Sequence, residues 1–248
     1  MALCAATLIT CFYLALSSAG AVGTSLSSHG AADEIVAKNI DARGGLAAWR
    51  AVQSMSMLGH IEAGKGLEVP FRLELKRPRK MRLEIVFQGQ TAVQVYDGKT
   101  GSKLRPFLGR STVEPLSAEE QQAAAAQLSL DGPFVDYVAK GYKIELAGRE
   151  PVEEHDAYKI KLTLEEGAVR HIWLDAASLL EVKMEEVRPL RGTQRRITTY
   201  YRDYRPVSGL VIPHVLETVA EGVPGRHKLT IEKVELNPQL ADSRFTKP

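Results

Sequence analysis

The sequence predicts a mainly β protein of the α+β class, built on a strongly curved or incompletely closed antiparallel sheet of about ten or eleven strands. Three runs alternate apolar and polar residues, at 71–76, 81–87 and 158–165, with Val86 as the exception. A period of two gives each strand one apolar and one polar face. Hairpin-like connections at 64–66, 77–79 and 88–90 favour antiparallel neighbours. So many strands tend to curl, and the apolar face requires a cover.

Helical segments supply that cover. Residues 31–43 have helical spacing and end at the pair Gly44 and Gly45, and a second short helix follows with Leu46, Trp49 and Val52. A capping box at 117–120 opens an alanine-rich helix that runs to about residue 128, and 134–138 suggests a further turn or two. From 142 onward the chain predicts only strands. We expect the helices to lie on the concave face of the sheet.

The first 21 residues differ from the rest of the chain. Residues 2–16 are almost all apolar and carry no charge, and small residues follow up to Ala21. This pattern predicts a signal peptide over 1–21, cleaved after Ala21. A short transmembrane anchor is the alternative, although the run is short for a span of ~30 Å. Both cysteines, Cys4 and Cys11, lie in this segment, so the exported, periplasmic form would contain no thiol.

The remaining chain predicts one domain. We expect a short flexible lead at 22–30 and a single domain over 31–248, because no linker rich in Pro, Gly or Ser interrupts it. Of the 248 residues, 44% are hydrophobic and 25% are charged, and 32 basic residues face 30 acidic ones. This near-neutral balance gives no electrostatic argument for nucleic acid as a partner. We expect a monomer.

Several short motifs occur in a characteristic order. Trp49 follows the Gly44–Gly45 helix end, and the segments at 95–101, 172–175, 201–204, 209–213 and 234–238 come before Phe245 and Pro248. In this order and spacing, the sequence resembles the LolA/LolB-like outer-membrane lipoprotein-sorting proteins over most of 31–248. Ser102 stands where relatives often have a tryptophan. The resemblance implies an incompletely closed antiparallel β-barrel with a helical lid. It also implies carriage of lipid or lipoprotein acyl chains across the periplasm, with membrane-bound donor and acceptor proteins as possible partners.

The apolar side of the alternating runs is the candidate ligand site. An acyl chain needs weakly directional apolar contacts, each buried CH₂ contributing about 0.8 kcal/mol. Each of these side chains is alternatively ordinary core packed against the helices. The candidate lining consists of Phe71, Leu73, Leu75, Met81, Leu83, Ile85, Phe87, Ile160 and Leu162. The candidate lid contacts are Ile35, Val36, Ile40, Trp49, Phe134 and Val138.

Polar clusters point less clearly to function. Six arginines lie between Arg188 and Arg205, but neighbours Arg195 and Arg196 must point to opposite faces of a strand, which favours a solvated surface over a phosphate site. The acidic group at 153–156 is typical of a solvated turn. Six histidines are scattered without metal-ligand spacing, at positions 29, 60, 155, 171, 214 and 227. We therefore expect no metal, no cofactor and no enzymatic activity.

The sequence thus predicts a periplasmic carrier that binds acyl chains non-covalently in a hydrophobic cavity and shuttles them towards the outer membrane. A sensor or binding module of the same fold, with a hydrophobic protein segment as its ligand, is the alternative. An uncharacterised hydrolase is a more distant one.

Overall fold

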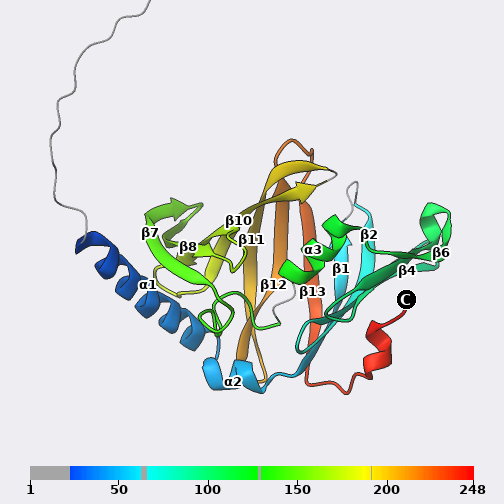
Figure 1. Ribbon diagram of the computed structural model, residues 1–248, viewed down its shortest axis with the longest axis horizontal. Helices are drawn as coiled ribbons and strands as arrows, with labels where there is room; N and C mark the ends of the chain where they lie inside the picture. The colour runs from blue at the N-terminus through cyan, green and yellow to red at the C-terminus, as the bar shows by residue number, and fades with distance from the viewer. Residues whose placement is uncertain (1–22, 63–65, 128–129, 191) are drawn as a thin grey trace, which may run out of the picture.

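The protein is mainly β, and its strands form one antiparallel sheet. The computed structural model describes residues 23–62, 66–127, 130–190 and 192–248. Over these residues the sheet has thirteen strands in the order β6-β5-β4-β3-β2-β1-β13-β12-β11-β10-β9-β8-β7 (Figure 1). The first six strands thus form one arm, the last seven form the other, and the pairing of β1 with β13 joins them.

The strand bounds agree with most of the predicted segments. The first arm contains β1 (Ser54–Glu62), β2 (Glu68–Lys76), β3 (Lys80–Phe87), β4 (Gln90–Tyr96), β5 (Gly101–Arg105) and β6 (Arg110–Pro115). The second contains β7 (Lys143–Val152), β8 (His155–Thr163), β9 (Val169–Asp175), β10 (Glu181–Leu190), β11 (Thr193–Val207), β12 (Leu210–Ala220) and β13 (His227–Leu236).

Two features of the predicted sheet were wrong. The count is thirteen rather than ten or eleven, because β5 and β6 are strands although their polar sequences lack clean alternation. The sheet remains open, as expected, but it is not strongly curled, and β6 and β7 are its two edges within the described chain. Helices and a connecting segment bury much of the apolar face, so the sheet does not need to roll up on itself to cover that face.

Three α-helices are present among the described residues. They are α1 (Gly23–Ala42), α2 (Leu46–Ala51) and α3 (Ala118–Gln127). The first begins before the predicted start at 31, so residues 23–30 of the expected lead are helical. The capping box of α3 is confirmed: Ser117 N–H donates to Glu120 Oε2 (2.9 Å), and Glu120 N–H donates to Ser117 Oγ (3.2 Å). The predicted signal peptide at 1–21 lies outside the described residues, and the domain division stays a prediction.

The segment at 130–141 forms hydrogen-bonded turns rather than a helix, and it joins the helices to the sheet. Its neighbours Phe134 and Val135 are both buried, but Phe134 packs in the core below α1 whereas Val135 packs in the core around Trp49 of α2. The buried Asp131 carboxylate accepts from Arg77 Nη2 (2.7 Å) and Lys140 Nζ (2.8 Å). The segment therefore links two hydrophobic clusters to the β2–β3 turn.

The chain end covers part of the opposite side of the sheet, which we name the outer face. Two 3-10 helices are described, η1 (Pro106–Leu108) and η2 (Asp242–Phe245), and η2 lies against β3 and β4. Phe245 is fully buried there. Arg244 donates from Nε (2.8 Å) and Nη2 (2.9 Å) to the two oxygens of Glu74, whose side chain is 3% exposed. A bidentate pair fixes the orientation of both side chains.

A substitution of Gly59 in β1 tests the β1–β13 pairing that joins the two arms. A Cβ at this position would lie 1.9 Å from the Thr230 carbonyl oxygen, at an irregularity of the β1–β13 pairing. We expect Gly59→Ala to lower the free energy of unfolding by at least about 2 kcal/mol. Gly30 in α1 is the matched control, because no heavy atom lies within 4 Å of the place that a Cβ would occupy there; Gly30→Ala should raise stability by about 0.5–1 kcal/mol. Urea unfolding measures both, and equal effects would contradict the assignment.

Candidate functional site

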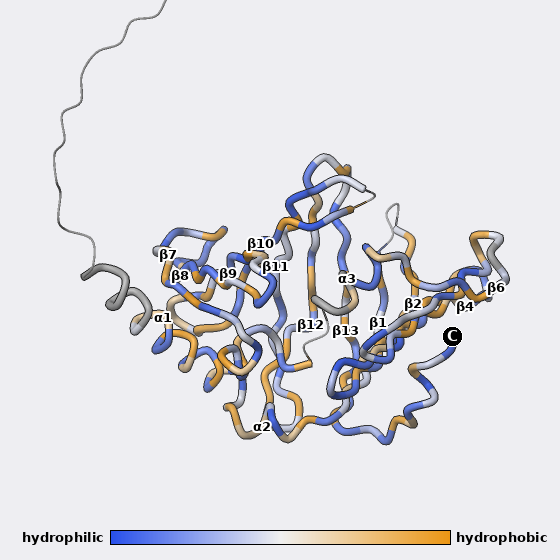
Figure 2. Tube along the Cα trace, viewed as in Figure 1, coloured by the Kyte–Doolittle hydropathy of each residue, from blue (hydrophilic) through white to orange (hydrophobic). Residues whose placement is uncertain are grey.

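The nine predicted lining residues all lie on one face of the sheet, the face that the helices cover. In antiparallel pairs, directly opposed residues share a face. Leu73 is opposite Leu83, Phe71 is opposite Ile85, and Leu75 is opposite Met81. Figure 2 shows hydrophobic and hydrophilic colours alternating along the strands of the first arm, near β2 and β4. On the second arm, Ile160 and Leu162 share a core with Val36 of α1. We name this side of the sheet the helix-covered face.

Burial divides the predicted lining into two groups. Ile160 and Leu162 are completely buried below α1, as parts of a packed core. Phe71, Leu75 and Met81 are also buried, each less than 10% exposed. The partly exposed members are Leu73, Leu83, Ile85 and Phe87. The accessible part of the predicted site is therefore on β2 and β3.

The predicted lid residues also differ in position. Val36, Trp49 and Phe134 are 1% exposed and belong to the cores between the helical segments and the sheet. Ile35 and Ile40 are partly buried against the same cores. Val138 is 71% exposed, so it does not pack onto the sheet. The structure also places Ala124 of α3 over Leu75, Met81 and Tyr96, where the sequence offered only a low-bulk alanine helix.

The strand register adds apolar residues that the sequence interpretation missed. One row of directly opposed side chains crosses five strands, from Tyr201 through Leu216, Leu229 and Ile61 to Val69. A second row runs through Val234, Met57, Leu73 and Leu83. The alternation at 55–61 and 229–236 contains this information, but only the β1–β13 pairing brings these distant segments together.

A polar group borders the second row on β5. Gln94 lies opposite Leu83, and Lys103 lies opposite Gln94. Lys103 Nζ donates a short hydrogen bond to Glu120 Oε2 of α3, and Arg105 Nη2 donates to Glu120 Oε1 (3.0 Å). Burial of the Glu120 carboxyl opposes its ionisation. Hydrogen bonds from Lys103 and Ser117, together with the charges of Lys103 and Arg105, outweigh that effect and lower the Glu120 pKa to about 2.

A second polar group lies where α1 meets the sheet. Arg43 Nη1 donates to Glu181 Oε1 (3.2 Å), and both side chains are about 10% exposed or less. Tyr204 donates from its hydroxyl to the Glu181 main-chain oxygen (2.8 Å), and burial raises the Tyr204 pKa well above its ordinary value. The Arg43 guanidinium also stacks on the Trp49 ring, 4.5 Å from its centroid. These contacts fix the end of α1.

Two of the arginines between Arg188 and Arg205 have partners within the protein. Arg202 pairs with Glu153 (2.8 Å) and Glu217 (3.2 Å), while Arg195 Nη1 donates to the Glu221 carbonyl (2.7 Å). Within the described residues, no group of three His, Cys, Asp or Glu side chains is arranged to hold a metal ion.

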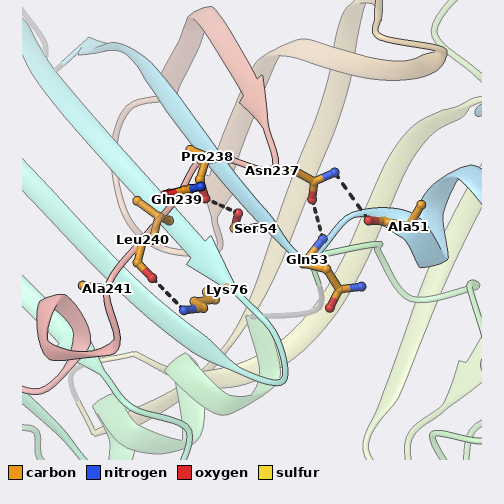
Figure 3. A pocket seen from close by; sticks show the side chains of 9 residues that line it. All are labelled: Ala51, Gln53, Ser54, Lys76, Asn237, Pro238, Gln239, Leu240 and Ala241. Atoms are coloured by element: carbon orange, nitrogen blue, oxygen red, sulfur yellow. Dashed lines mark hydrogen bonds between the residues drawn. The ribbon is translucent and has the colours of Figure 1, made fainter.

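A pocket of 710 Å³ opens on the outer face beside the chain end. Figure 3 shows that its polar groups bind one another: Ser54 Oγ donates to the Pro238 carbonyl (2.6 Å) and Lys76 Nζ donates to the Leu240 carbonyl (2.6 Å). Asn237 accepts from the Gln53 N–H (2.7 Å). These contacts hold the chain end in place, and the pocket lies on the side of the sheet opposite the predicted lining.

The fold is similar to that of solved lipoprotein-sorting proteins. A LolA superfamily protein from Nitrosomonas europaea matches with a TM-score of 0.58 and 16% identity, over 87% of this chain and 97% of that one. An outer membrane lipoprotein-sorting protein domain from Vibrio parahaemolyticus matches with a TM-score of 0.57 and 12% identity, over 88% and 97%. A DUF1329 family protein from Desulfovibrio piger gives 0.59 and 15%, over the same shares. The predicted resemblance to this fold is thereby confirmed.

Sequence comparison adds no closer relative. No protein-family model matches the chain, and no curated protein matches it. Among the helices of the described chain, none has the length and apolar character needed to cross a membrane.

The Glu120 contacts predict a specific pH dependence of stability. The folded-state pKa of about 2 lies below the ordinary value of 4.5 that applies to the unfolded chain, so the stabilisation is complete above about pH 4.5 and is lost as the pH falls towards 2. Glu120→Gln keeps a side chain that suits a capping box but removes the charge. We expect the variant to be less stable than the wild type at pH 6, with the difference shrinking below pH 4.5. Urea unfolding across pH measures this, and a constant difference would contradict it.

Proposed function

We propose that this protein is a periplasmic carrier that binds lipid or lipoprotein acyl chains non-covalently on its helix-covered face. The observation that carries the proposal is the pair of apolar rows across the central strands, which include the partly exposed Leu73 and Leu83. The similarity in fold to lipoprotein-sorting proteins supports it. Delivery towards the outer membrane, export by the segment 1–21, and membrane-bound donor and acceptor partners belong to the same proposal.

The energetics suit reversible binding. Ten CH₂ groups of an acyl chain, fully buried, contribute about 8 kcal/mol before the costs of ordering are subtracted. Apart from Tyr201, whose hydroxyl already donates to Met184 Sδ, the two rows consist of Leu, Met, Val and Ile side chains, which offer this without a polar group that needs a partner. Binding of this kind requires no covalent step and releases its ligand unchanged.

The cover over these rows is suited to move. The α3 sequence from 118 to 127 contains five alanines, and Ala124 is its one side chain in the buried apolar cluster among those described. Alanine contributes little buried area compared with leucine or phenylalanine. Displacing α3 therefore withdraws little apolar surface of the helix itself, and it would uncover Leu75 and Met81 of the same cluster, whose burial an acyl chain can restore.

A matched pair of β3 variants tests the binding face. Leu83 is partly buried on the helix-covered face, whereas Val86 lies on the outer face and is 41% exposed. We expect Leu83→Glu to weaken binding of a fluorescent fatty acid at least about tenfold, because a carboxylate is costly in an apolar site. Val86→Glu should leave binding unchanged. Urea unfolding shows whether each variant is folded, and equal affinities in two folded variants would contradict the proposal.

The class of ligand is tested by what the protein retains on gentle purification. We expect lipid in a solvent extract, identified by mass spectrometry, and we expect the Leu83→Glu variant to retain less of it. Cross-linking from a residue introduced at Leu83 identifies the captured species. Capture of an unlipidated protein segment, with no lipid in the extract, would instead support a sensor or binding module.

A further inference from the structure

Two cations of β5 face the helix-covered face and share one carboxylate of α3. The Lys103 side chain is 10% exposed, and its ammonium binds Glu120; Arg105 binds the other oxygen of the same carboxylate. A cation this buried needs an anionic or hydrogen-bonding partner. The pair therefore forms an anion-binding group that a side chain of the protein's own helix α3 occupies.

The anion-binding group lies at the end of one of the two apolar rows. The row from Met57 through Leu73 and Leu83 continues to Gln94 and ends at Lys103. Four inter-strand spacings separate Met57 from Lys103, which amounts to about 19 Å. A chain of methylene groups lying along the row would place its polar end at Lys103 and Arg105.

The balance of charge favours an anion at that end. Glu114 lies opposite Lys103 on β6, so it also belongs to this part of the face. Arg110 lies opposite Arg105 in the same way, so with Glu120 in place three basic positions share this part of the face with two acidic ones. If α3 moved away with Glu120, the basic residues Lys103, Arg105 and Arg110 would remain with Glu114 as the acidic residue of these paired positions, which leaves an excess of positive charge. An incoming anion would restore the balance that Glu120 maintains.

We propose that Lys103 and Arg105 form a subsite for the anionic head group of an amphiphile, a carboxylate or a phosphate, which Glu120 occupies in the unliganded protein. The inference rests on the carrier function proposed above and deepens it by naming the ligand class. Binding exchanges one anion for another at the two cations. Only a negatively charged ligand can replace Glu120 and so break the ion pairs that hold α3. The head group therefore selects which amphiphiles reach the apolar rows.

The test compares a fluorescent fatty acid with its methyl ester, which has the same chain without the charge. We expect the wild type to bind the acid more tightly than the ester. Glu120→Gln, which preserves the capping pattern, should increase the acid-to-ester preference about tenfold, the size of one charge-assisted hydrogen bond. Arg105→Gln should reduce the preference by a similar factor. Acetate and inorganic phosphate, titrated separately, report whether free anions bind the two cations without a chain.

Two variants serve as matched controls. Glu119→Gln removes the same charge from the neighbouring position of α3, and Arg188→Gln removes a cation from β10 on the face that Met184 shares with the α1 core. Both should leave the acid-to-ester preference within about twofold of the wild type, since Glu120 is the carboxylate that binds Lys103 and Arg105, and Arg188 pairs with Glu186. A preference that Glu120→Gln and Arg105→Gln do not change would overturn the subsite. So would displacement of the acid by acetate or phosphate at equal concentration, which would indicate a site for free anions.

The outcome also separates this inference from the function on which it rests. Binding of both probes with equal affinity in every variant would remove the head-group subsite and keep the carrier. Failure of the folded wild type to bind either probe would remove the carrier function, and the subsite with it.

Discussion

The antiparallel pairing of β1 with β13 is the contact on which the rest of the structure depends. It joins two arms whose strands otherwise follow chain order, so that residues such as Met57 and Val234, far apart in sequence, become direct neighbours. The glycine at position 59 belongs to this contact, because the Thr230 carbonyl occupies the space that a side chain would need. Each apolar row of the helix-covered face crosses this joint. Without it, the molecule would have two separate sheets and no continuous apolar surface.

The helix-covered face is held by two chemically different kinds of cover. Over the second arm, α1 and Phe134 bury Ile160 and Leu162 completely, and Arg43 fixes the helix end through Glu181. Over the first arm, α3 contributes Ala124 to a buried cluster, and Glu120 joins the helix to Lys103 and Arg105 by ion pairs. Apolar burial is insensitive to charge and to salt screening, whereas an ion pair is sensitive to both. A change in charge or in salt concentration would therefore weaken the attachment of α3 to the first arm more than that of α1 to the second.

The sequence predicted the elements of this fold better than their assembly. The alternation at 71–76 and 81–87 correctly indicated the strands and the face that each side chain occupies, and the capping box at 117–120 correctly located the start of α3. The strands β5 and β6 were missed because their sequences are largely polar; in β5, Lys103 and Arg105 occupy the positions where an apolar residue would show the period. The strong curl was wrong because nothing local in a sequence reports how much of a sheet face other segments will cover.

The sequence predicted which residues share a face of the sheet in the candidate site, but not how buried each of them is. Alternation identified the face of the sheet, but it cannot separate a fully buried Ile160 from a partly exposed Leu83, because that difference depends on which helix lies above each strand. The pairing of Lys103 with Glu120 was hidden for the same reason. A lysine at a position that faces the helices breaks the apolar pattern of its strand. Its presence there is explained by the Glu120 carboxylate, which is its neighbour only in the folded chain. In a core that serves only to stabilise the fold, a buried lysine beside apolar rows lowers stability. On a face that exchanges its helix for an amphiphile, the same cation gives the ligand's polar end a partner where the apolar rows stop.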